Sequence, residues 1–305
     1  MHTHGTQRVL FLSLIATVAF VGLETAIGLR ANSLALLSDA AHNFTDAFAL
    51  VLAAAGLYFQ SRPANQFKTY GYHRTGVLAA FLNSVTLVIV SFVLLYEAYQ
   101  RYAAPETVEE SAMIWVAAVG LVLNASIAFG LGGHGHDLNI RAAWIHMAGD
   151  AASCLAIIAG GFLIRSTGWL VIDPLLSALI AGAILWSSIG ILRDSLNILL
   201  EGLPKGLNLT GVADQMKGIV GVLDVHDLHI WSIGSASHAL SCHVLIEDMP
   251  PSESNVILEA INHMLHERFE IGHTTIQFEH VRCAIPDDCC AQASAHFHPH
   301  DHHTH

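Results

Sequence analysis

The chain has 305 residues, of which 53% are hydrophobic and 12% are charged, and its formal net charge is −12. A charged share about half of the usual one excludes an ordinary soluble globular protein, and the acidic balance argues against nucleic acid as a partner. The five cysteines do not form the framework of a disulfide-rich domain, so we interpret them as thiols or metal ligands in a reducing compartment.

Long apolar segments occupy the first two thirds of the chain, and short polar stretches separate them. Each segment meets or exceeds the roughly 20 residues that cross about 30 Å of hydrocarbon as a helix. The segments are residues 9–29, 34–59, 77–99, 112–132, 140–164 and 170–199. We therefore predict a six-helix transmembrane domain over residues 9–200, preceded by a His-containing cytoplasmic N-terminus at residues 1–8.

The basic residues of the short loops predict the orientation of this domain, because cytoplasmic loops carry an excess of Lys and Arg. One side of the membrane receives Arg8, Arg62, Lys68, Arg74, Arg141, Arg193 and Lys205, and the other side receives Arg30, Arg101 and Arg165. This asymmetry predicts a multi-pass protein of a bacterial inner or plasma membrane, with both termini in the cytoplasm.

The second apolar segment contains the stretch SDAAHNFTDAFAL, residues 38–50. Asp39, His42, Asn43 and Asp46 follow the helical spacing i, i+3, i+4 and i+7, so they share one face. A carboxylate at mid-membrane costs at least about 2.5 kcal/mol, so this face must point to a protein interior or a wet path.

The fifth segment repeats the pattern, with His146 followed four residues later by Asp150. One such pair could be a structural hydrogen-bonding group, but two pairs on different helices predict a shared site. Brought face to face, His42, Asp46, His146 and Asp150 form an N2O2 set that suits tetrahedral Zn²⁺, with Co²⁺ and Cd²⁺ as competitors. Asp39 and Asn43 are interpreted as outer partners of this site or as part of the ion path.

The rest of the chain mixes polar and apolar residues and has no segment that could span a bilayer. After a linker at residues 201–208, the pattern over residues 209–284 predicts helix, strand, strand, helix and strand. This order indicates a cytoplasmic α/β domain of the ferredoxin-like, βαββ-containing type. Residues 285–305 form a Cys/His-rich tail.

The cytoplasmic part offers candidates for a second metal site, for which simple solvation is the alternative. They are His226 and His243 on neighbouring predicted strands, Glu279 on the last strand, and Cys283, Cys289 and Cys290 beyond it. His134 and His136, like the His-rich tail, are typical of tracts that collect metal loosely.

Five motifs together resemble the cation diffusion facilitator family of divalent-metal exporters. They are SLALLSDAAHNFTD, YGYHR, DLNIRAAWIHMAGDAAS, DSLNILLEGLP and VHDLHIWSIG. The resemblance implies a homodimer that works as a metal/proton antiporter, and the His-plus-Asp ligand set is similar to the zinc-preferring branch. It also implies regulatory zinc at His226 and His243, where Gln277 replaces a relative's ligand. Thr75-Gly76 departs from the family's Ala-Glu, which puts a metal role of His73 in doubt.

These observations predict a secondary active transporter, not an enzyme, that exports Zn²⁺, and with it Cd²⁺ or Co²⁺, in exchange for protons. Metal and protons compete for the same imidazole and carboxylate atoms, so a proton gradient suffices as the driving force. The chain has no phosphate-binding loop for ATP and no H-E-x-x-H string of a metalloenzyme. A membrane-anchored metal sensor would not explain the duplicated ligand pairs, and a passive channel is the nearest mechanistic alternative.

Overall fold

The computed structural model describes residues 3–60, 62–131, 138–234 and 237–281. The chain divides into two compact units. The first comprises Met1–Tyr58 with Leu78–Ser195, and the second comprises Phe59–Val77 with Leu196–His305.

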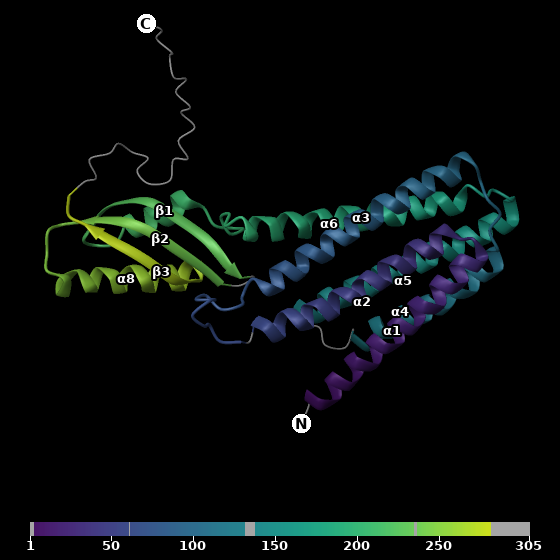
Figure 1. Ribbon diagram of the computed structural model, residues 1–305, viewed down its shortest axis with the longest axis horizontal. Coiled ribbons are helices and arrows are strands. Elements are labelled where there is room, and N and C mark those ends of the chain that lie inside the picture. The colour runs from purple at the N-terminus through teal and green to yellow at the C-terminus, as the bar shows by residue number, and fades with distance from the viewer. Residues whose placement is uncertain (1–2, 61, 132–137, 235–236, 282–305) are drawn as a thin grey trace, which may run out of the picture. The chain divides into compact units, whose positions relative to one another are not determined.

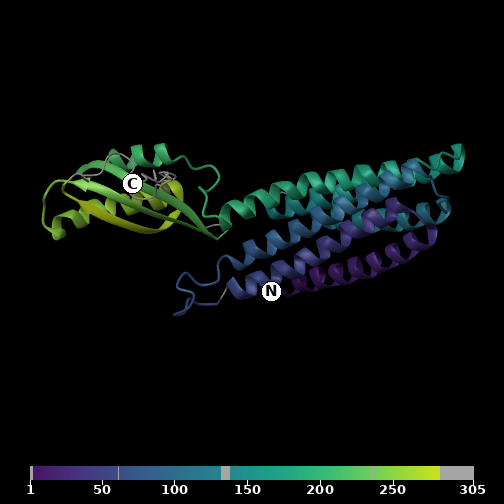
Figure 2. The same ribbon diagram turned by 45° about the horizontal axis from the view of Figure 1, so that its top comes forward.

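Long helices that run side by side build the first unit (Figures 1 and 2). In the described residues they are α1 (Thr3–Ala31), α2 (Leu34–Gln60), α3 (Thr75–Ala103), α4 (Glu110–Leu131), α5 (Leu138–Thr167) and α6 (Ile172–Leu199). Each predicted apolar segment lies within or overlaps one of these helices. Four stretches in the described residues are long and apolar enough to cross a bilayer: Thr75–Ala103, Glu110–Phe129, Met147–Thr167 and Ile172–Leu199.

The outer surface of this unit is apolar, as expected for a helical membrane domain. Phe129 and Trp186 are each 85% exposed. Such side chains lose nothing by facing hydrocarbon, whereas backbone polar groups must be paired inside each helix. The described residues therefore support a helical membrane domain, and a crossing by all six helices stays a prediction.

Small residues let α4 approach both α1 and α5 closely. A Cβ atom added at Gly120 of α4 would lie 2.7 Å from the Phe20 ring, and one added at Gly161 of α5 would lie 2.6 Å from Ile114. Both distances are below van der Waals contact, so any larger residue would push the helices apart. This packing holds α5 against the bundle and thereby positions its polar residues.

The second unit contains a three-stranded sheet. Its elements are α7 (Leu209–Lys217), β1 (Val222–Gly234), β2 (Ser237–Ile246), α8 (Pro251–Phe269) and β3 (Ile271–Glu279). β1 pairs antiparallel with β2, which pairs parallel with β3. The predicted order of helix, strand, strand, helix and strand is confirmed. Residues 201–208, which precede α7, contain no strand; they form turns, and Gly206 has a φ of 85°. The expected βαββ order requires a strand before this helix, so the observed order differs from it.

In the described residues, helices cover one face of the sheet and none packs on the other. Val212 and Met216 of α7 and Ile261 and Leu265 of α8 share a buried cluster with alternate residues of β2. Those residues are Leu240, Cys242 and Val244. Because side chains alternate along a strand, His243 lies on the opposite face. The uncovered face therefore carries the histidines that the sequence singled out.

Candidate metal centres

Helix α2 is fixed at its first turn by an acid from α6. The Asp173 carboxylate accepts hydrogen bonds from Ser33 Oγ at 2.6 Å, from the Leu34 amide at 2.8 Å and from the Ala35 amide at 3.2 Å. A carboxylate at a helix N-terminus satisfies free amides and complements the helix dipole. This contact sets the rotation of α2, and with it the direction of the polar face that follows.

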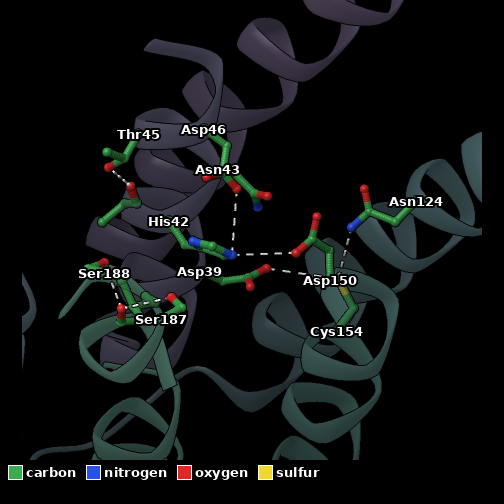
Figure 3. Close-up of polar contacts among 12 residues, drawn as sticks. Asp39, His42, Asn43, Thr45, Asp46, Asn124, Asp150, Cys154, Ser187 and Ser188 are labelled. Carbon is green, nitrogen blue, oxygen red and sulfur yellow. Dashed lines mark hydrogen bonds and ion pairs between the residues drawn. The ribbon is translucent and has the colours of Figure 1, made fainter. Parts of the chain in front are cut away.

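The polar face of α2 meets α5 at His42 (Figure 3). His42 Nε2 lies 3.6 Å from Asp46 Oδ2 on its own helix and 3.4 Å from Asp150 Oδ1 on α5. Single donor atoms of His42, Asp46 and Asp150 all lie within 4.8 Å of one another. Asp150 is buried and the other two side chains are partly buried. Two helices thus bring three of the four predicted ligands together.

The distances in this cluster are those that a tetrahedral metal requires. Ligand atoms at about 2.0–2.2 Å from Zn²⁺ stand about 3.3–3.6 Å apart. The two distances from His42 Nε2 fall at this spacing. The separations of His42 Nε2 from the two carboxylates are therefore compatible with a shared divalent cation.

The fourth predicted ligand, His146, lies on α5 four residues before Asp150. Its side chain is outside the described residues. The helical spacing alone places His146 and Asp150 on the same side of α5.

Asp39 lies one turn before His42 and is 1% exposed. Figure 3 shows its carboxylate directed toward Cys154 of α5, whose Sγ donates to Asp39 Oδ2 at 3.8 Å. Asn124 of α4 donates in turn to the same sulfur at 3.8 Å. Sequence reasoning did not foresee that Cys154 joins these groups, although its position four residues after Asp150 was a usable signal.

Asn43 points to α1 instead of toward the His42 cluster. Its Nδ2 donates to Glu24 Oε2 at 3.3 Å, and the Glu24 side chain is fully buried. Asn83 of α3 and Asn124 of α4 are also buried.

The uncovered face of the sheet carries a second cluster. His226 and His243 are paired across β1 and β2, and their ring centroids are 5.4 Å apart. Glu279 of β3 joins them, with Oε1 2.9 Å from His243 Nδ1 and Oε2 3.2 Å from His226 Nε2. These three residues form the other metal-compatible group of the described chain.

Asp227, which sequence reasoning missed, borders this cluster. Its Oδ1 lies 2.9 Å from His229 Nε2 and its Oδ2 lies 3.9 Å from His243 Nε2. The regular pairing of β1 shifts between His226 and His229, and Asp227 has a φ of 50°. A strict two-residue alternation would turn Asp227 away from His226, so only the irregular backbone brings its carboxylate to this face.

Several predicted site residues are outside the described residues or have another role. Cys283, Cys289, Cys290, His134 and His136 lie outside them. Gln277 lies beside His243 in the sheet register and donates to Glu279 Oε1 at 3.0 Å. His73 packs against Gly234 and is not in a metal-compatible group of the described chain.

An apolar helical unit with an internal His/Asp cluster, followed by an α/β unit with a His/Glu cluster, defines a membrane protein that handles metal ions. Residues 10–200 match the cation efflux transmembrane domain, and residues 204–281 match the cation efflux protein cytoplasmic domain. The chain belongs to the cation efflux family, a family of metal cation transporters.

Curated relatives match over nearly the whole chain. The metal cation efflux system protein CzcD of Cupriavidus metallidurans is 37% identical over 94% of this chain and 90% of its own length. The cadmium, cobalt and zinc/H(+)-K(+) antiporter of Bacillus subtilis is 37% identical over 91% of each chain. Zinc transporter ZitB of Escherichia coli is 36% identical over 98% of this chain and 95% of its own length.

Proposed function

We propose that this transporter exports Zn²⁺ from the cytoplasm in exchange for protons, through a tetrahedral site of His42, Asp46, His146 and Asp150. The observation that carries the proposal is the cluster of His42, Asp46 and Asp150, whose donor atoms come from two helices at the spacing of a bound metal. The names of the zinc and metal/proton relatives support it.

The donor set explains how one site serves both ions. Zn²⁺ binds neutral imidazole and ionised carboxylate, so each proton that binds removes a metal ligand. Two aspartates also balance the charge of the dication and reduce the cost of holding it inside the membrane. Metal binds when the site opens to the cytoplasm, and protons from the more acidic side displace it when the helices open outward.

The same donor set limits the cargo. Two imidazoles and two carboxylates suit Zn²⁺, and Co²⁺ and Cd²⁺ compete for such sites. Two residues border the path of the ion. Asp39 lies one helical turn from His42, and Asn43 follows His42 in the sequence. In this proposal all six helices cross a bacterial inner or plasma membrane, both termini are cytoplasmic and the transporter works as a homodimer.

The cytoplasmic cluster supports a second, regulatory role. His226, His243 and Glu279 offer two imidazoles and a carboxylate on an open sheet face, where an ion from the cytosol has direct access. Zn²⁺ held there would report the cytoplasmic concentration and tighten the contact between the two copies. The Cys283, Cys289 and Cys290 thiols are further candidate ligands of this site, and His134 and His136 are candidates for loose collection of ions.

The test is metal uptake into proteoliposomes, measured for Zn²⁺, Cd²⁺ and Co²⁺ with and without an imposed pH difference. We expect uptake to rise when the compartment that receives the metal is the more acidic one. Asp46→Ala should abolish it while the protein stays folded. Wild-type flux from that variant would contradict the proposed site, and flux that ignores the pH difference would identify a passive channel.

A further inference from the structure

Glu24 is a fully buried acid of α1 that the proposed ligand set does not use. Its Oε2 accepts a hydrogen bond from Asn43 Nδ2 at 3.3 Å, and its Oε1 receives no hydrogen bond from a donor in the described chain. A carboxylate buried in the middle of a helix bundle is costly unless it is paired or protonated. Its protonation state is therefore the question that the structure raises.

A second buried carboxyl group contacts Glu24. Asp39 of α2 is 1% exposed, and its side chain is within hydrogen-bonding contact of Glu24. Asp39 Oδ1, like Glu24 Oε1, has no donor in the described chain. Ionised carboxylates only accept hydrogen bonds, so two of them can pair only when one carries a proton.

In the described chain, the groups around this pair offer little positive charge to stabilise a second ionised carboxylate. The polar and titratable groups that surround it in the described chain come from α2, α4 and α5: Asn43, His42, Asn124, Cys154 and Asp150. Only His42 among them can carry positive charge, and its ring is shared with two other carboxylates. Two neighbouring buried carboxylates cannot both ionise under these conditions.

We propose that Glu24 holds one proton against Asp39 in the metal-free transporter and releases it to water when a divalent cation binds beside His42. The O–H bond of the Glu24 carboxyl breaks, the proton enters solvent and the carboxylate remains. When the metal leaves, the carboxyl takes up a proton again. This inference rests on the proposed metal site and assigns one of the exchanged protons to a residue outside the ligand set.

The coupling follows from charge and distance. Asp39 and His42 are three residues apart on α2, a separation of about 4.5 Å along the helix axis. Across so short a gap of low dielectric, a dication strongly stabilises the ionised form of Asp39 and offsets the repulsion that keeps its neighbour Glu24 protonated. A purely structural Glu24 would instead keep its proton whether or not metal is bound.

The experiment counts protons released per Zn²⁺ bound to the purified full chain in weakly buffered detergent solution, with a pH indicator. Glu24→Gln should bind Zn²⁺ and release about one proton fewer than the wild type. The apparent Kd of the wild type should also change about tenfold more per pH unit than the apparent Kd of this variant, because in the variant one proton fewer competes with the metal. An unchanged proton count and an unchanged pH slope would overturn the inference.

Controls separate this inference from the proposed function. Asp46→Ala should lose Zn²⁺ binding at the His42 site, and if it binds like the wild type, the proposed function itself fails. Glu97→Gln removes an exposed acid of α3 that pairs with Arg101 at 3.6 Å, and it should leave the proton count unchanged. If Zn²⁺ binding requires Asp46 but Glu24→Gln releases as many protons as the wild type, the inference about Glu24 is wrong and the proposed metal site stands.

A spectroscopic measurement covers the case in which Glu24→Gln does not fold. The infrared spectrum of the wild type should lose the band of one protonated carboxyl group when Zn²⁺ is added. In Glu24→Asp the band should shift in frequency and still disappear with metal, since the shorter side chain keeps the acid. A carboxyl band that persists after Zn²⁺ saturation overturns the inference.

Discussion

The clusters around His42 and His243 use the same donor types on different backbone supports. In the first, helices α2 and α5 supply the ligands from inside a bundle, where Asp150 is 5% exposed and the His42 and Asp46 side chains are 21% and 28% exposed. In the second, three strands supply them on an open sheet face, where the His226, His243 and Glu279 side chains are 27%, 24% and 17% exposed. In the proposed function, the same donor chemistry serves ion passage between two helices and ion sensing on a sheet.

This contrast predicts how the two sites respond to the loss of a ligand. Loss of a ligand beside the buried Asp150 leaves an uncompensated charge that water solvates poorly. An open cluster can fill a vacant position with water at modest cost.

The largest effect is expected from Asp150→Asn, which keeps the shape of the side chain and removes its charge. The dication then faces one carboxylate instead of two inside the bundle, and we expect Zn²⁺ flux to fall more than about 100-fold, beyond the range typical of outer-sphere changes. Proteoliposome uptake measures it. Glu97→Gln is the control with an unchanged flux, and a loss of less than tenfold would place Asp150 outside the ligand set.

A smaller effect, on selectivity, is expected from His42→Asp. This change turns an N2O2 set into an oxygen-richer one, and oxygen ligands favour Mn²⁺ over Zn²⁺ relative to imidazole. We expect the ratio of Zn²⁺ to Mn²⁺ uptake to fall about tenfold, with measurable transport retained. Competition between the two metals in one vesicle preparation checks it. An unchanged ratio would show that the His42 ring does not touch the cargo.

Loss of ligands from the cytoplasmic cluster should reduce Zn²⁺ flux less than loss of a ligand from the cluster around His42. His226→Ala combined with His243→Ala should reduce the number of tightly bound Zn²⁺ ions per chain by one, measured by equilibrium dialysis, while flux at saturating Zn²⁺ changes less than about fivefold. The matched control is His266→Ala, because His266 is exposed on α8 and pairs only with its neighbour Glu267. A loss of flux as severe as that of Asp150→Asn would contradict the division of roles between the two clusters.

The helical cluster could be predicted from the sequence far better than the strand cluster. The i, i+4 spacing of His42 and Asp46 places them on one helical face, however the helices pack. The same spacing in His146 and Asp150 identified α5 as the partner helix. Cross-strand neighbours depend on register, and the sequence placed His226 and His243 only on neighbouring strands. Asp227 was missed because the irregular pairing near it breaks the alternation. The Glu24–Asp39 contact between α1 and α2 depends on helix rotation and depth, which no local pattern contains.

The smallest expected effect concerns Cys242, and it tests the register on which the second cluster depends. Cys242 faces the helices, next in sequence to His243, and burial together with the nearby Asp227 charge raises the pKa of its thiol to about 12. Thiolate is the form that reacts, so at pH 8 only about one thiol in ten thousand is reactive, and reactivity should rise only as the pH approaches that pKa. Mass spectrometry of the Cys242 peptide after alkylation should show labelling about 1,000-fold slower than in urea.

The control for this measurement is His243→Cys in the same chain, whose thiol should react readily at pH 8 because it stands on the uncovered face. A one-residue slip of β2 would exchange the two positions, since every side chain of the strand would change face. Fast labelling at Cys242 with slow labelling at position 243 would therefore place a thiol instead of an imidazole beside Glu279. That outcome would remove the cytoplasmic cluster and leave the cluster inside the bundle untouched, because the helical spacing of its ligands does not depend on the sheet.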